Sequence, residues 1–373
     1  MRIVVLGGYG NFGARICRGL APDAGLTVIA TGRNPSAAPP DFANLNISTI
    51  ALDIHAAGAA RALQALSPNI VIHCAGPFQQ QGYDVARAAL AGGAHYIDLS
   101  DGRDFVAGFA AAVNAEALRA HRLAVTGAST LPALSSAVVD EYLSAFSHLD
   151  GIDTVIAPGQ HAPRGIATLR AVLSYAGKPF DVWQDGAWQK MYGWMHVKKA
   201  YIGMLGWRRS AVCDVPDLAL FPQRYSGIRH ARFRAALEVG FQHWALALLA
   251  AVQRLGVSLP ITHLAPLMES AAGFFDVAGS GNGGMSVTLH GTNLRNSAQR
   301  EHEHEHTIRW SLVAPNNHGP EIPCMPAILL ARKLARGQVS QVGAMPCMGL
   351  LTLAEFAPEF AKWGISTQVE EIA

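Results

Sequence analysis

A short apolar run that leads directly into glycines constrains the fold of this chain more than any other feature. Residues 2–6 predict a buried strand, and residues 11–20 have the apolar spacing of a helix. Between them stand Gly8, Gly10 and Gly13, in the pattern Gly-x-Gly-x-x-Gly. A strand, a glycine turn and a helix in this order are typical of a nucleotide-binding loop at the start of a parallel sheet.

Each glycine has its own role in such a loop. Gly8 permits the tight turn, Gly10 lets a pyrophosphate approach the backbone, and Gly13 lets the helix pack close to the strand. The amides at the helix start then face the phosphates. A glycine-rich structural turn is the alternative. The residues expected to bind a dinucleotide here are Gly7, Gly8, Tyr9, Gly10, Asn11, Phe12 and Gly13.

Strands and helices are expected to alternate over the next hundred residues. Apolar runs predict further strands at 26–31, 48–52, 69–74, 95–99 and 123–126. Helical spacing predicts helices at 56–66, 83–91 and 107–120. The alternation predicts an α/β fold with a Rossmann-type, doubly wound parallel sheet. Ligands of such sheets bind beyond the carboxyl ends of the strands.

The choice of dinucleotide depends on the residues that follow the second strand. The stretch "TGRNP" has no acidic residue to hold a ribose 2′-hydroxyl. Arg33 stands 20 residues after Gly13, where its guanidinium could pair with a 2′-phosphate. A solvated loop charge is the alternative. The sequence therefore favours NADP over NAD. Asp53, after the third strand, either hydrogen-bonds the adenine amino group or caps a helix.

The fourth strand ends in "HCAGPFQQQG". The small residues Ala75, Gly76 and Pro77 would run beneath the middle of the cofactor, where the backbone can come close. Phe78 would border the nicotinamide. His73 lies inside the strand and is expected to be a core histidine.

The fifth strand ends in "YIDLSDGRDF", the densest group of ionisable residues near the expected cofactor edge. Asp98 and Asp101 are the candidate acid/base residues, with Tyr96 beside them, because burial or a neighbouring charge can raise the pKa of an aspartate into a useful range. A loop hydrogen bond from each aspartate to the backbone is the alternative. Ser100 is a candidate cofactor contact.

These segments together resemble the saccharopine dehydrogenase-like oxidoreductases. The matching stretches are "GGYGNFG" (7–13), "CAGPF" (74–78), "GYDVARAALAGGAHYIDLSD" (82–101), "GASTLPALSSA" (127–137), "HGPEIPCMPAILLARKLARG" (318–337) and "GAMPCMGLLTLAEF" (343–356). The resemblance implies an NAD(P)-binding Rossmann domain and a second domain with a sheet of its own. It does not extend to lysine biosynthesis, because the middle of this chain is unusually apolar.

Three segments follow from these patterns. They are a Rossmann NAD(P)-binding domain (1–128), an α+β substrate and dimerisation domain (129–325), and a C-terminal helical segment that packs across the domain junction (326–373). The second domain is expected to hold a mixed sheet, with a strand at 153–158, a helix at 165–177, a hairpin at 179–191 turning at Asp185-Gly186, and a late antiparallel pair, 283–293 and 302–314.

The tract "EHEHEH" (301–306) falls in that late pair. On a strand, His302, His304 and His306 share the side that continues into Ile308, Trp310 and Leu312. Three such positions span about 13 Å, which is too far for all three to reach one ion easily. We therefore predict no metal site and favour a partly exposed strand end, with a lining of the substrate pocket as the alternative.

Composition excludes several classes of function. The net charge of +2 and the lack of a long basic tract give no case for nucleic acid. Five cysteines without CxxC spacing predict reduced thiols, and no signal peptide precedes the first apolar run, so a cytoplasmic protein is expected. Residues 241–257 predict an amphipathic helix that is too short in its apolar core to span a bilayer. It is expected to pack on its own domain, with contact to a membrane surface or a dimer partner as the alternative.

The functional prediction is an NADP-dependent oxidoreductase that transfers a hydride to or from a small molecule. The substrate is an amino-acid-like or more apolar carbonyl, imine or enoyl compound. No Tyr-x-x-x-Lys is present, so the proton relay of short-chain dehydrogenases is not supported. The alternative is an NADP-binding sensor or scaffold without turnover. A homodimer is expected.

Overall fold

The computed structural model describes residues 1–373 except 164–169, 171–172, 256–278, 298–299 and 373. The chain forms two compact units. The first unit comprises Met1–Leu134 and Pro320–Leu351, and the second comprises Ser135–Gly319 and Thr352–Ala373. The C-terminal region was expected to form one helical segment from residue 326 onward. In the structure its first part belongs to the first unit and its last part to the second.

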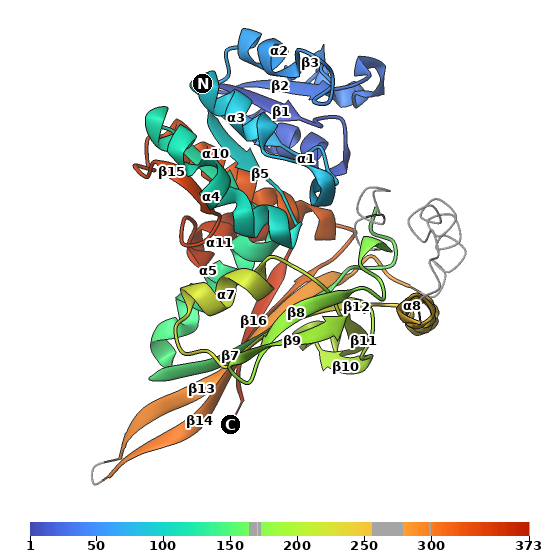
Figure 1. Ribbon diagram of the computed structural model, residues 1–373, viewed down its shortest axis with the longest axis vertical. Helices are drawn as coiled ribbons and strands as arrows, with labels where there is room; N and C mark the ends of the chain where they lie inside the picture. The colour runs from blue at the N-terminus through green and yellow to red at the C-terminus, as the bar shows by residue number, and fades with distance from the viewer. Residues whose placement is uncertain (164–169, 171–172, 256–278, 298–299, 373) are drawn as a thin grey trace. The chain divides into compact units, whose positions relative to one another are not determined.

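The first unit is built on a parallel sheet, as the sequence predicted (Figure 1). The sheet has seven strands rather than the six expected, because Gly343–Pro346, in the segment expected to be helical, adds a strand at its edge. Its strand order is β15-β6-β5-β4-β1-β2-β3. The strands are β1 (Arg2–Leu6), β2 (Thr27–Gly32), β3 (Ser48–Ala51), β4 (Ile70–His73), β5 (His95–Asp98), β6 (Leu123–Thr126) and β15 (Gly343–Pro346). The central strands are buried along most of their length, which explains their continuous apolar sequence. The predicted fold class is confirmed.

Five helices connect and cover these strands in the described part of the first unit. They are α1 (Asn11–Leu20), α2 (Ala59–Ala65), α3 (Asp84–Ala91), α4 (Arg103–Arg119) and α10 (Met325–Ala335), with short 3-10 turns between them. Most of the bounds lie within a few residues of the predicted ones. The largest difference is at α4, which begins four residues earlier than predicted because Gly102 ends the preceding loop in an extended conformation.

The C-terminal segment of the first unit packs on the first helix. A Cβ atom at Gly19 of α1 would lie within 3.0 Å of the Ile328 side chain of α10, so the two helices approach at a glycine. Arg332 of α10 pairs with Asp23 at 2.7 Å and donates to the Gly19 carbonyl at 2.8 Å. β15 then adds to the edge of β6 in parallel register. Residues 320–351 therefore complete the sheet that residues 1–134 begin.

The second unit holds a mixed sheet of nine strands, which also confirms the prediction. The main order is β10-β11-β12-β7-β13-β14-β16, and β8 pairs with β12 and β9. The strands are β7 (His148–Ala157), β8 (Pro179–Gln184), β9 (Ala187–Tyr192), β10 (Lys198–Tyr201), β11 (Trp207–Val212), β12 (His230–Leu237), β13 (Gly283–Ser297), β14 (Arg300–Ala314) and β16 (Ser366–Ile372). The helices that pack around this sheet are α5 (Ser135–Tyr142), α7 (Asp217–Arg224), α8 (Gly240–Arg254) and α11 (Leu353–Lys362).

The two faces of this sheet differ in chemistry. Side chains of Ile152, Val287 and Trp310 are buried on one face, and the Trp310 ring lies 6.4 Å from that of Phe360 in α11. The alternate positions hold Asp153, which is half-buried, but also Val155 and Ala157, which are buried in a small apolar cluster with Ile202 and Ala236. The second unit therefore has one apolar face under helices and one mixed face, which is polar around Asp153 and apolar around Val155.

Two hairpins in this unit match the sequence expectations. β8 and β9 are antiparallel, and Asp185 and Gly186 both have positive φ, as a type I′ turn requires. β13 and β14 form the predicted late antiparallel pair. The side chain of His302 lies outside the described residues, whereas His304 is exposed and the His306 ring lies 5.1 Å from that of Phe146. The helix expected at 165–177 falls largely on residues outside the described ones.

α8 packs on β11 and β12 of its own domain, as expected, but much of its apolar stripe is exposed. Phe241 is 49% exposed, Trp244 55%, Leu248 66%, and Leu255, at the end of the helix, 84%. The buried side chains of α8 include His243 and Leu246. The buried face differs from the apolar stripe because helical spacing identifies an apolar face without showing which face is covered. In the described part of the chain, no helix combines the length and apolar character needed to cross a membrane.

Candidate cofactor site

The glycine turn between β1 and α1 has a backbone that only glycine can form. Gly7 has a φ of +74°, and its carbonyl accepts the Gly10 amide at 3.0 Å. A Cβ atom at Gly13 would lie within 3.0 Å of the Gly7 carbonyl group and of Gly8. A Cβ atom at Gly8 would press against Ala30 of β2. The turn is therefore held tightly against both the helix and the sheet.

The start of α1 is open to a ligand. Gly10 is its N-cap residue, and no side chain caps the helix there. Gly10 is exposed, and a Cβ atom added to it would meet only one atom within 4 Å, the Gly7 oxygen at 3.3 Å. The first amides of a helix lack intrahelical acceptors and favour an anion. The space over Gly10, which a side chain would fill, fits the pyrophosphate of a dinucleotide.

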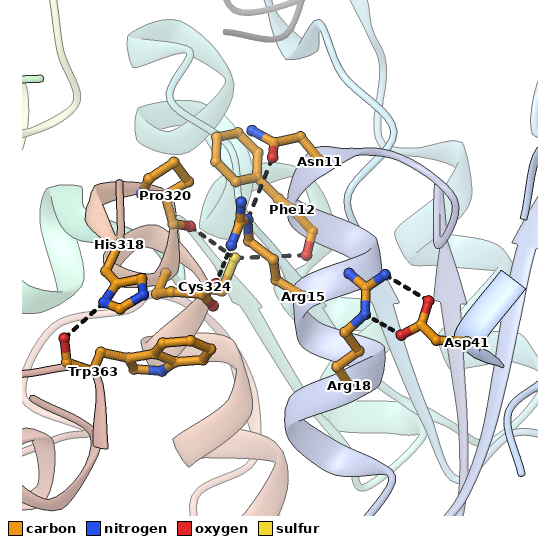
Figure 2. Close-up of polar contacts among 10 residues, drawn as sticks. Asn11, Phe12, Arg15, Arg18, Asp41, His318, Pro320, Cys324 and Trp363 are labelled. Carbon is orange, nitrogen blue, oxygen red and sulfur yellow. Dashed lines mark hydrogen bonds and ion pairs between the residues drawn. The ribbon is translucent and has the colours of Figure 1, made fainter. Parts of the chain in front are cut away.

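The C-terminal segment holds the first turn of this helix (Figure 2). Arg15 forms an ion pair with Glu321, and the side chains are only 20% and 7% exposed. The Arg15 Nε also donates to Asn11 Oδ1 at 3.3 Å. The Cys324 thiol donates to the carbonyl of Phe12 at 3.6 Å. Asn11 and Phe12, two of the expected cofactor residues, are thus fixed by residues to which the sequence had assigned no role.

Tyr9 is anchored to the sheet. Its hydroxyl donates to the Ile50 carbonyl at 2.9 Å and to that of Ala30 at 3.2 Å. A Cβ atom at Gly32 would collide with its ring, so Gly32 leaves the space that the ring occupies. Arg33 follows directly, at the carboxyl end of β2. It is exposed and makes no side-chain hydrogen bond or ion pair with the described residues.

Asp53 holds its own loop. Its Oδ1 accepts the amide of His55 at 3.0 Å. The helix that follows begins at Ala59 with Gly58 as its N-cap, so Asp53 does not cap that helix. The predicted contact with adenine stays a prediction.

The "CAGPF" loop lies against the glycine turn. A Cβ atom at Gly7 would be 2.9 Å from the amide nitrogen of Ala75. Gln81, for which the sequence predicted no role, donates to the carbonyls of Ala75 at 2.7 Å and Pro77 at 3.0 Å. Gly76 and Pro77 are the exposed part of the loop.

Phe78 lies in the core rather than on the exposed part of that loop. It is buried, with its ring 4.9 Å from that of His73 and 5.4 Å from that of Phe105. The side chain of Phe78 is therefore not on the surface, where it was expected to border the nicotinamide. The aromatic cluster instead supports the loop from beneath.

Asp98 is wholly buried at the end of β5 and ties neighbouring loops together. Its Oδ1 accepts the Thr126 hydroxyl and the amides of Ser100 and Gly127, each at 2.9 Å. Burial raises the pKa of Asp98 to about 6, although these hydrogen bonds oppose the shift. Asp98 therefore makes hydrogen bonds to the backbone of its loop, which was the alternative to an acid/base role.

Tyr96 and Ser100 are also buried. The Tyr96 hydroxyl lies 3.0 Å from Nδ1 of His73. Burial lowers the pKa of His73 to about 3, so this ring is neutral, as expected of a core histidine. The Ser100 hydroxyl accepts the amide of Gly102 at 3.2 Å. The Ser100 hydroxyl thus holds the loop after β5, whereas the Tyr96 hydroxyl contacts β4.

Asp101 is the exposed member of the three predicted acid/base residues. It accepts a hydrogen bond from Gln79 Nε2 at 3.1 Å, and Gln79 lies on the loop after β4. The structure thus brings Asp101 to the carboxyl ends of β4 and β5, where ligands of parallel sheets bind.

The strand order, the glycine turn and the open helix start define a dinucleotide-binding domain. Residues 3–131 match the family model of the saccharopine dehydrogenase NADP binding domain. The resemblance predicted from the sequence is therefore confirmed for this part of the chain, and the domain is of an NADP-binding type. No curated protein matches the chain in sequence.

Solved structures match the whole fold at low identity. Apo saccharopine dehydrogenase (L-Glu forming) from Saccharomyces cerevisiae aligns over 100% of both chains, with a TM-score of 0.67 and 11% identity. Homospermidine synthase from Legionella pneumophila, in complex with NAD, has a TM-score of 0.59 and 10% identity, covering 100% of this chain and 91% of its own. An engineered D-amino acid dehydrogenase bound to NADP⁺ has a TM-score of 0.50 and 14% identity, over 97% and 98%. The two-domain fold is shared with these enzymes.

Proposed function

We propose that this protein is an NADP-dependent oxidoreductase. The observation that carries the proposal is the open glycine turn at α1 in a domain of the NADP-binding type. When bound, NADP supplies or accepts a hydride. The chain's own part is to hold the pyrophosphate at the helix start, to select the cofactor and to orient the substrate. The fold shared with dehydrogenases supports this class of activity.

Selectivity for NADP is assigned to Arg33. Its side chain is exposed at the end of β2, and no described residue neutralises it. A guanidinium in that place pairs with a 2′-phosphate through two parallel hydrogen bonds. No acidic side chain stands in "TGRNP" to favour the ribose hydroxyl of NAD instead.

Proton transfer is assigned to Asp101 among the predicted residues, because it is exposed at the carboxyl edge of the sheet. Asp98 and Tyr96 are proposed as positioning residues, since Asp98 is buried and holds the loop that carries Asp101, and Tyr96 is buried and interacts with Asp98. The substrate is proposed to be an amino-acid-like or apolar carbonyl, imine or enoyl compound, and the protein is proposed to act as a homodimer.

The selectivity is tested by measuring dissociation constants for NADPH and NADH with wild type and Arg33→Ala. We expect the variant to lose at least about tenfold in NADPH affinity with little change for NADH, since one charged hydrogen-bonded contact is worth 1.5–3 kcal/mol. Arg119→Ala is the matched control, because Arg119 is exposed at the far end of α4. Equal losses for both cofactors, or none, would reject the assignment.

Turnover is tested by following NADPH oxidation with a panel of carbonyl, imine and enoyl compounds. Oxidation by at least one class is expected, and Asp101→Asn should lower kcat more than it raises KM. The burial of Asp98 and Tyr96 leaves few acid/base groups, which favours a non-catalytic NADP sensor as the second candidate. Tight NADPH binding without oxidation by any compound would support that second candidate.

A further inference from the structure

Three adjacent strands of the second unit bring two histidines and an aspartate to one place. Asp153 lies on β7, His230 begins β12, and His290 lies on β13. The register pairs both His230 and His290 with Gly151, two residues before Asp153 on the central strand. Because side chains alternate along a strand, all three lie on the same face of the sheet, the mixed one.

Gly151 provides the room for this arrangement. A Cβ atom at position 151 would lie within 3.0 Å of three atoms of the His230 ring. The imidazole therefore lies directly over the glycine, which does not need a positive φ here. The rings of His230 and His290 are 5.6 Å apart between centroids.

The donor atoms converge on one oxygen of the aspartate. His290 Nε2 lies 3.1 Å from Asp153 Oδ2, and His230 Nε2 lies 4.0 Å from the same oxygen. One ligand atom from each of the three residues falls within 4.8 Å of the others. Ligands about 2.1 Å from a tetrahedral zinc ion are about 3.4 Å apart, so small movements would place all three around one ion.

The surroundings orient these donors. The other nitrogen of His290, Nδ1, lies 3.3 Å from the hydroxyl of Thr307, which directs Nε2 toward Asp153. His230 Nε2 is buried and has no hydrogen-bond partner. Arg232 approaches the other carboxylate oxygen, Oδ1, at 3.8 Å. Its positive charge lowers the affinity for a cation, but it leaves Oδ2 to the two histidines.

We propose that Asp153, His230 and His290 form a binding site for a divalent transition-metal ion, with Zn²⁺ as the expected ion. Two imidazoles and one carboxylate are a donor set that zinc accepts, and water would complete the shell. The side chains are 32%, 18% and 35% exposed, so the cluster is only partly buried. The bound ion would link the three central strands β12, β7 and β13.

The test is a zinc titration of the full-length protein after removal of metals with a chelator. Competition with a chromogenic chelator should show one tight site per chain, and replacement by Co²⁺ should give the visible spectrum of a four-coordinate ion. Asp153→Asn and His290→Ala should each weaken binding at least tenfold. Gly151→Ala keeps all three donors but should displace His230, so it should also weaken binding. Circular dichroism checks that each variant is folded.

The histidine-rich tract provides the control. The double variant His304→Ala/His306→Ala removes one exposed and one half-buried histidine outside the cluster and should retain the site. Thr307→Val keeps the three ligands and should weaken binding about tenfold, since an orienting hydrogen bond contributes 10–100-fold to metal affinity. The proposal is rejected if wild type binds no stoichiometric zinc, if folded Asp153→Asn binds like wild type, or if the tract variant alone abolishes binding. The cluster would then be an Asp–His hydrogen-bonded group.

Discussion

Glu321 pairs with Arg15 across 306 positions of the sequence, and the contact holds the first turn of the helix that begins at the glycine loop. Both side chains are largely buried, and Arg15 also bonds to Asn11 (Figure 2). The C-terminal segment thus supports the cofactor site without being next to it in sequence.

Glu321→Gln should lower both stability and cofactor affinity. The substitution keeps the shape but leaves the Arg15 charge without its ionic partner in a mostly buried place, which we expect to cost about 2 kcal/mol of unfolding free energy. Urea unfolding and NADPH titration measure the two effects. Asp41→Asn is the matched control, because it breaks an exposed ion pair with Arg18 on the same helix. The contact has no special role if both variants behave alike.

Gly13→Ala should weaken NADPH binding at least tenfold. The added methyl group would meet the Gly7 carbonyl within 3.0 Å, so the turn must open and the amides at the helix start must move. Fluorescence titration with NADPH measures the loss. Gly319→Ala serves as the control, since a Cβ atom there meets nothing within 4 Å. Unchanged affinity in Gly13→Ala would show that the tight turn is not needed for binding.

Asp98→Asn should remove a pH dependence from stability. The pKa of Asp98 is about 6 in the folded protein against a reference value of 3.8, so ionisation above this range disfavours the folded state. The protonated Asp98 carboxyl therefore contributes most to the free energy of unfolding below pH 4, and this contribution is lost as pH rises through 6. The stability of the variant relative to wild type should rise by about 2 kcal/mol between pH 4 and 7. Urea unfolding at several pH values measures this difference, and a flat difference contradicts the burial argument.

The two sides of α8 should respond differently to substitution. Leu246 is buried, and Leu246→Ala should cost about 2–4 kcal/mol of unfolding free energy. Leu248 is mostly exposed, and Leu248→Gln should change stability by less than about 0.5 kcal/mol. Thermal and urea unfolding measure the stability of both variants relative to wild type. A large loss for Leu248→Gln would mean that this side is covered in solution.

Local patterns were enough to predict most of the first unit. The strand Arg2–Leu6 and the helix Asn11–Leu20 have the predicted bounds, because the apolar run and the glycines act over neighbouring residues. The turn at Asp185-Gly186 was predictable for the same reason, since only a few residue types accept positive φ at both positions.

Contacts between distant segments decided what the sequence could not show. The end of β5 suggested an acid/base role for Asp98, but its buried carboxylate accepts hydrogen bonds from Thr126, at the end of β6, and from Gly127, which follows it. The role of Glu321 depends on Arg15, and the cluster around Asp153 draws on three strands. The spacing of residues along the chain does not predict contacts between such distant segments. For the same reason, the sequence could not show which face of α8 is buried against its own unit.

The position of β15 also has a consequence for synthesis. The ribosome synthesises residues 1–134 well before residues 320–351. Until β15 has been synthesised, one edge of β6 therefore has no strand to pair with. That edge carries Leu123, Ala124 and Val125, whose unpaired backbone groups are a template for wrong partners. The nascent chain must therefore keep this edge from aggregating until its own C-terminal strand emerges.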